Sequence, residues 1–334
     1  MTRLETEPRN PAEGGSDVAR LVWIDVLRGA AVFLVIATHA IDAVIQRTGD
    51  APQALIFIGD ALAPFRIPTL MFLSGLLLPR SLSKPARVFF TGKLRAIGWP
   101  FLVWTVVILA ATGKLSLKRL LVNVVTPETV LWYLWFLLAA YVVVWLLDVW
   151  RVPLALPIAA FAVLAALDVD LYRFSRFFYL LLFFVAGLLV VRHQMRVSAW
   201  TRSRRVIAVA ATLAVATAAL SAAGVEVRYQ LAFAPGVMAG VMAFAALARR
   251  VAGRAARVLQ ALGRDSLVFY VTHWPVLWLS VGGVVLAGTG PWLAWCLGIT
   301  GALAIGALAA TCRRRNRWVD ALFTPPRVRR RVAD

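Results

Sequence analysis

Residues 23–44 read WIDVLRGAAVFLVIATHAIDAV, and this stretch decides the fold class. A helix of this length rises about 33 Å, which matches the roughly 30 Å hydrocarbon core of a bilayer. The stretch is mainly apolar but contains four ionisable residues, Asp25, Arg28, His39 and Asp42. Charges inside a membrane-spanning helix are costly and usually mark a functional site. The stretch therefore predicts a transmembrane helix that carries candidate catalytic residues.

The four ionisable residues share one face of the predicted helix. Arg28 and His39 are eleven residues apart, which places them within roughly 20° of each other around the axis. Asp25 lies about 60° from Arg28, and Asp42 about 60° from His39. Along the axis, about 16 Å separates Arg28 from His39. The pattern predicts a polar stripe that connects the two halves of the membrane. Two alternatives remain open, an imidazole bonded to a neighbouring helix and an interfacial Asp25–Arg28 ion pair.

The rest of the chain repeats the apolar pattern. Of its 334 residues, 61% are hydrophobic and 16% are charged, whereas soluble proteins carry about 25% charged residues. Residues 55–63 are expected to form a short interfacial or re-entrant helix, and residues 115–128 are amphipathic and too interrupted to span. The sequence predicts an all-α polytopic membrane bundle of about ten transmembrane helices. The predicted spans are approximately 22–45, 64–79, 88–111, 131–149, 153–168, 175–191, 205–223, 229–248, 266–287 and 290–312.

Charge predicts how the spans are oriented. When alternate loops are compared, 27 Lys and Arg residues fall on one side and 7 on the other. Cytoplasmic loops retain basic residues, so both termini are predicted to be cytoplasmic. We expect a disordered N-terminus over residues 1–20, a membrane domain over 21–312 and a basic tail over 313–334. The net charge of +20 lies in short loops without a nucleic-acid-binding motif, which indicates anionic membrane lipid rather than nucleic acid as its partner.

Five short segments carry a further pattern. In LVWIDVLRGAAVFLVIATHAI (21–41), an Asp is followed by Arg28-Gly29 and then by His39. The other segments are IPTLMFLSGLLL (67–78), KLRAIGWPFLVW (93–104), LWYLWFLLAAY (131–141) and DSLVFYVTHWPVL (265–277). In this order they resemble the acyltransferase-3 family of integral membrane O-acyltransferases over about residues 20–310. No hydrolase-like domain of the kind that some members append is seen, so transfer is expected to be completed within the membrane domain.

This resemblance implies an O-acyltransferase, of the O-acetyl type, in the cell membrane. It implies cytoplasmic acyl-CoA as the donor substrate, no permanently bound cofactor, and a hydroxyl of a glycan, glycolipid or glycosylated metabolite as the acceptor. His39 is the expected general base, and Asp25 and Arg28 are expected to orient the donor or the polar stripe. The expected acyl-CoA-binding residues are Arg95, Arg87 and Lys93. Many members have Arg-x-x-Arg at this place, whereas Gly92 stands three positions before Arg95 here.

The expected acceptor-side residues are Ser74, Trp135, Asp42 and His273. Three of them have an alternative role that stays open: close helix packing for Ser74, an interfacial aromatic belt for Trp135, and packing beside Pro275 for His273. The spacing of the histidines predicts no metal site. Another class of function also remains, a transporter or flippase for an anionic lipid or metabolite, although no internal repeat supports it. Within the enzyme hypothesis, direct transfer competes with an acyl-histidine relay.

Overall fold

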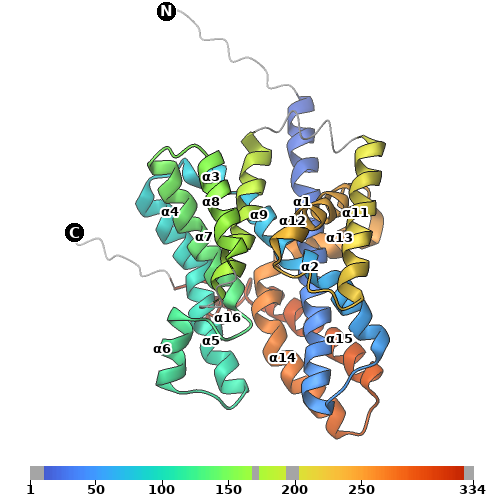
Figure 1. The fold of residues 1–334 in the computed structure, drawn as a ribbon. Helices are drawn as coiled ribbons and strands as arrows, with labels where there is room; N and C mark the ends of the chain where they lie inside the picture. Colours follow the sequence, from blue (N-terminus) through green and yellow to red (C-terminus); the bar gives the residue numbers. More distant parts are fainter. Residues whose placement is uncertain (1–10, 168–172, 193–202, 327–334) are drawn as a thin grey trace, which may run out of the picture.

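The computed structural model describes residues 11–167, 173–192 and 203–326. Within these residues the protein is a bundle of helices without strands (Figure 1). Nine segments of the described chain are long and apolar enough to cross a membrane, which confirms the polytopic all-α architecture. They belong to α1 (Pro11–Thr48), α2 (Gln53–Leu76), α4 (Ala86–Lys93) with the π-helical turn Leu94–Gly98 and α5 (Trp99–Ala111), α7 (Trp132–Val149), α9 (Phe174–Arg192), α11 (Arg204–Ala222), α12 (Ala234–Ala248), α14 (Ser266–Leu286) and α15 (Pro291–Cys312).

Five shorter helices complete the described chain. The amphipathic segment 115–128 contains the nine-residue α6 and does not span, as predicted. The short helices are α3 (Pro79–Leu82), α6 (Leu117–Val125), α8 (Ala155–Ala166), α13 (Gly253–Arg264) and α16 (Arg317–Ala321).

The helix α1 contacts α2, α12, α13, α14 and α15, so it holds one side of the bundle together (Figure 1). Two glycines let α13 cross it closely. A Cβ on Gly29 would overlap the Leu259 carbonyl, and a Cβ on Gly263 would overlap the Asp25 carbonyl. Small residues permit such close approach of helices in membranes. The Arg28-Gly29 pair of the first motif therefore places an arginine next to a backbone-to-backbone helix crossing.

The helix α1 begins earlier than expected. It starts at Pro11, ahead of the predicted span 22–45. Proline is favoured in the first turn of a helix because its fixed φ suits the helix and its missing N–H is not needed there.

The helix α2 corrects the predicted boundary at residue 64. Residues 55–63 do not form a separate helix but continue through Pro64 and Pro68 as one helix of 24 residues. A proline removes the hydrogen bond to the carbonyl four residues earlier, which for Pro64 is the carbonyl of Asp60. The Ser221 hydroxyl of α11 donates to this carbonyl at 2.7 Å. A neighbouring helix thus satisfies the freed backbone group, as happens in membrane bundles.

The predicted span 153–168 is also shorter than expected. Its helix α8 has 12 residues, or about 18 Å, which covers only part of the roughly 30 Å hydrocarbon core. The preceding turn contains Arg151 at φ 52°, and α8 begins only after Pro153. Residues 168–172 lie outside the described part of the chain.

The first and last spans begin and end on the same side of the bundle. Near the start of the first span, Asp25 lies within electrostatic reach of Arg264, the last residue of α13. Near the end of the last span, Arg314 is ion-paired with Asp265, which follows Arg264 in the sequence. Beyond this point, α16 lies against α5, where the indole N–H groups of Trp99 and Trp104 donate to carbonyls of residues 321 and 322. The side concerned is the basic one, which the charge count predicts to be cytoplasmic.

Candidate active site

His39 on α1 is bonded to Asp42 one turn later. The distance from His39 Nδ1 to Asp42 Oδ2 is 2.9 Å. An ionised carboxylate only accepts, so Nδ1 carries the proton and donates it, and the lone pair lies on Nε2. The His39 side chain is 21% exposed and that of Asp42 49% exposed. The pair is therefore an oriented imidazole with an accessible basic nitrogen.

A second histidine, His273 on α14, packs directly against His39. Its ring stacks on that of His39 with 5.3 Å between centroids and 22° between planes. It is 0% exposed, and its Nδ1–H donates to the Tyr270 carbonyl at 2.5 Å. Its Nε2 is buried without a hydrogen-bond partner. Trp274 contacts the edge of the His39 ring, with 5.7 Å between centroids. The segment beside Pro275 thus combines packing with direct contact to the candidate base.

Polar aromatic side chains continue from His273 into the bundle. The ring of Tyr270 lies 5.7 Å from His273 and 5.5 Å from Tyr133 of α7. The Tyr133 hydroxyl is 3.4 Å from the Ser74 hydroxyl of α2. Ser74 itself donates to the Leu70 carbonyl at 2.8 Å. No basic side chain is bonded to Ser74 in these contacts, so it suits a structural or lining role better than that of a nucleophile.

The series of polar side chains continues from Tyr133 to Arg28, at the end opposite His39. Arg28 Nη1 lies 3.7 Å from Asp25 Oδ1, and both side chains are 22% exposed. The charge of Arg28 reaches the hydroxyls of Tyr133 and Tyr141. Lys93 lies over the Tyr141 ring, with Nζ 3.8 Å from the centroid. Five helices (α1, α2, α4, α7 and α14) thus contribute to one polar path. We define it as Arg28, Lys93, Tyr141, Tyr133, Ser74, Tyr270, His273, His39 and Asp42.

Arg66 on α2 was not among the expected site residues. It lies within electrostatic reach of Asp42 and His273, and its Nη1 is buried without a hydrogen-bond partner. Arg228 in the α11–α12 connection also acts on Asp42. The next residue, Tyr229, has a φ of 63°, an unusual value for a bulky side chain that signals local strain. The His39 end of the path is therefore flanked by two arginines.

Three expected site residues lie away from this path. Arg95 is in the π-helical turn and donates to the Pro325 carbonyl at 3.3 Å. Arg87 is exposed on α4. The indole of Trp135 donates to the Val124 carbonyl at 2.9 Å and thereby joins α7 to α6. Of the three expected acyl-CoA-binding residues, the structure brings only Lys93 to the polar path.

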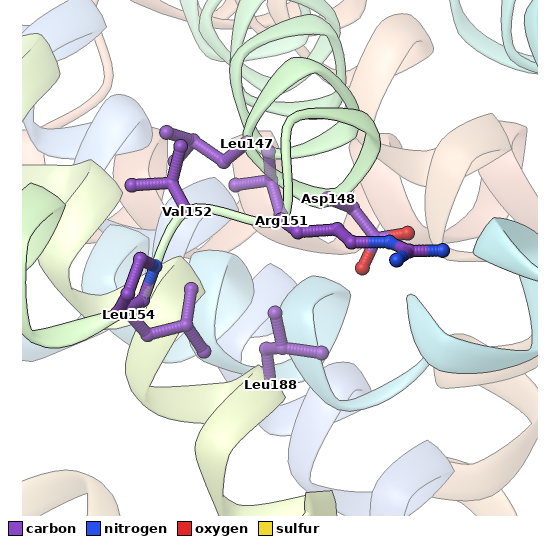
Figure 2. A pocket seen from close by; sticks show the side chains of 8 residues that line it. Leu147, Asp148, Arg151, Val152, Leu154 and Leu188 are labelled. Atoms are coloured by element: carbon purple, nitrogen blue, oxygen red, sulfur yellow. The ribbon is translucent and has the colours of Figure 1, made fainter.

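A pocket of about 320 Å³ between α7, the turn that follows it and α9 offers a contrast (Figure 2). Its wall includes Leu147, Val152, Leu154 and Leu188, and the Arg151 side chain extends beside Asp148. It contains neither histidine nor tyrosine. The pocket therefore lacks the imidazole and phenol groups found along the polar path, and Asp148 is its one carboxylate.

The fold and the His39–Asp42 pair define an integral membrane protein with a site suited to general-base chemistry. The acyltransferase domain family model matches residues 21–311, and the chain belongs to this family. It is a membrane-bound acyltransferase. No curated protein and no solved structure matches the chain. The matched range contains every residue of the polar path, so the candidate site lies wholly within the acyltransferase domain.

Proposed function

We propose that this acyltransferase moves an acetyl or other acyl group from cytoplasmic acyl-CoA to a hydroxyl of a glycan, glycolipid or glycosylated metabolite. The observation that carries the proposal is the His39–Asp42 pair, whose geometry leaves Nε2 free to accept a proton. A neutral imidazole accepts a proton on its free nitrogen, which is what general-base catalysis requires. The proposed location is the cell membrane.

In the proposed reaction, the acceptor hydroxyl oxygen attacks the thioester carbonyl carbon while its proton passes to Nε2 of His39. The C–S bond then breaks, and the imidazolium returns the proton to the leaving CoA sulfur. The products are an O-acyl ester and free CoA. Asp42 holds the tautomer and stabilises the transient imidazolium. A positioned general base typically contributes about 10²–10⁴-fold to the rate.

The opposite end of the polar path has the charge needed for the donor. Arg28 and Lys93 present a guanidinium and an ammonium near Tyr141, on the side predicted to be cytoplasmic. Both groups can bind phosphate, and arginine does so with two parallel hydrogen bonds. We assign them to the donor, with Asp25 orienting Arg28 through their ion pair. Acyl-CoA would then approach from one end of the path and the acceptor from the other.

The competing version is a relay in which Nε2 of His39 attacks the thioester and carries the acyl group before transfer. Direct attack needs donor and acceptor bound together, whereas a relay gives ping-pong kinetics and labelled protein in the absence of acceptor. Both versions use the same nitrogen.

The test is incubation of the purified protein, in nanodiscs, with radiolabelled acetyl-CoA and a panel of glycans and glycolipids. We expect labelled product and CoA release that depend on acceptor, and we expect both to be lost in His39→Gln present at the same amount. Absence of product and of CoA release across a broad panel would contradict the proposal. Label retained on the protein without acceptor would favour the relay.

A further inference from the structure

A second cavity lies directly beside the candidate site. It has a volume of about 360 Å³, within the usual range for ligand pockets, and is lined by α1, α2, α12, α13 and the turn after α12. It opens to the surface of the bundle, where Leu247 in its lining is exposed. Its wall is made by apolar side chains, among them Leu27, Leu34, Phe65, Phe244 and Leu247. Such a lining favours a hydrocarbon occupant because every contact would remove apolar surface from water or fill a void.

Only two polar side chains line this cavity, Arg66 and Thr69. The Thr69 hydroxyl already donates to the Phe65 carbonyl at 2.7 Å. Arg66 differs because its Nη1 is buried without a hydrogen-bond partner. A buried guanidinium nitrogen that lacks a partner requires an acceptor, and an anion supplies the strongest one. The cavity thus has an apolar lining and one cationic side chain, Arg66, with a nitrogen that lacks a hydrogen-bond partner.

The position of Arg66 indicates which end of a bound ligand would lie near the candidate base. Arg66 lines the cavity and also lies within electrostatic reach of Asp42 and His273, so it links the cavity to the candidate site. On α1 the cavity is lined by residues 26–34, and His39 follows about 7.5 Å further along the axis. A ligand with its chain in the cavity would place its polar head beside the histidines. Its tail would extend toward the Arg28 end of α1, which is the end on the side predicted to be cytoplasmic.

We propose that this cavity binds the hydrocarbon chain of a phosphate-bearing lipid acceptor, with the phosphate on Arg66 and the hydroxyl to be acylated near His39. This assignment rests on the proposed acyl transfer for the role of acceptor, but binding of the lipid does not depend on it. The guanidinium of Arg66 favours a phosphate head over the neutral thioester of a donor chain. The donor phosphates are assigned to the opposite end of the path, at Arg28 and Lys93.

The test uses photolabelling of the full-length protein in phosphatidylcholine nanodiscs. The probe is dodecyl phosphate with a diazirine at the far end of its chain, and dodecanol with the same diazirine is the comparison. Two variants test the two parts of the site. Arg66→Gln removes the charge with little change in length, and Ala30→Phe fills the cavity from α1. Arg47→Gln is the matched control, because Arg47 is held by the Trp278 carbonyl outside the cavity.

We expect the phosphate probe to label peptides from α1, α2 or α12 at least fivefold more than the alcohol does. Arg66→Gln should remove that preference, Ala30→Phe should reduce labelling by the phosphate probe at least fivefold, and Arg47→Gln should change neither. Equal labelling by both probes, or labelling that neither variant changes, would overturn the site. Normal labelling in Ala30→Phe together with an altered preference for donor chain length would overturn the acceptor assignment in favour of the donor chain. The labelling outcomes are read without acyl transfer, so loss of the proposed activity leaves them interpretable.

Discussion

The two ends of the polar path are built from different chemical groups. At one end, Arg28 pairs with Asp25, and Lys93 lies over Tyr141. At the other, His39 donates to Asp42 and stacks on His273. The first end offers fixed cations and the second an oriented imidazole. This difference indicates that one end can bind an anionic group and the other can move a proton.

The comparison extends to the two stacked histidines themselves. A carboxylate partner can stabilise the imidazolium that forms when His39 accepts a proton, and partial exposure lets a substrate hydroxyl reach Nε2. His273 has a neutral backbone carbonyl as its partner and no exposed surface. The rings are close together, yet only His39 has both the partner and the access that a general base requires.

The two ends of the polar path should face opposite sides of the membrane. Labelling of introduced cysteines in intact cells should therefore occur on one side and be absent on the other, which is the largest effect that we expect. In a variant with Cys296 and Cys312 replaced by Ser, a cysteine at Arg254 should be shielded from an impermeant thiol reagent in intact cells. A cysteine at Lys114 should be labelled. The expectation rests on the distribution of Lys and Arg between alternate loops. The reverse labelling would invert the orientation and move the donor to the His39 end.

Removing the base should have the largest effect on catalysis. His39→Gln keeps much of the size and some hydrogen bonding but cannot accept a proton at neutral pH. We expect acyl transfer to fall about 100-fold or more. The measurement is the initial rate with labelled acetyl-CoA, normalised to folded protein in nanodiscs. A rate within a few-fold of the wild type would exclude His39 as the base.

Asp42→Asn should have an intermediate effect. An amide can still accept the Nδ1–H bond but brings no charge to stabilise the imidazolium. We expect the rate to fall about thirtyfold, less than a full general-base contribution, because the carboxylate is half exposed and Arg66 and Arg228 already act on it. The fall should appear in kcat. An unchanged kcat with a raised KM for acceptor would instead place Asp42 in acceptor binding.

Arg28→Lys tests the other end of the path. Lysine keeps the charge but loses the planar fork that can bind phosphate or carboxylate with two hydrogen bonds. We expect kcat/KM for acyl-CoA to fall about tenfold, equivalent to about 1.4 kcal/mol, mainly through KM. Wild-type kinetics at equal protein abundance would reduce Arg28 to a residue that sets topology or pairs with Asp25.

The sequence predicted much of the α1 side of the site, because helical periodicity alone puts Asp25, Arg28, His39 and Asp42 on one face. It did not predict the role of Arg66. Taking Pro64 as a helix start placed Arg66 near the end of a span, whereas in the continuous α2 it lies well inside. The hydrogen bond to the Asp60 carbonyl comes from Ser221 on α11, 161 residues away in sequence, and no local pattern reveals such a bond. The contact between His39 and His273 likewise depends on tertiary packing.

The smallest effect is expected for His273→Gln. The glutamine amide can donate to the Tyr270 carbonyl as Nδ1–H does, so the local bond can be kept. We expect transfer to fall less than about fivefold, through looser packing against His39. The decisive measurement is the double variant with His39→Gln. If His273 only positions the His39 ring, it has little left to contribute once that ring is gone, and the double variant should be no slower than His39→Gln alone. A further large loss in the double variant, or loss of transfer in His273→Gln with near-normal transfer in His39→Gln, would move the base to α14.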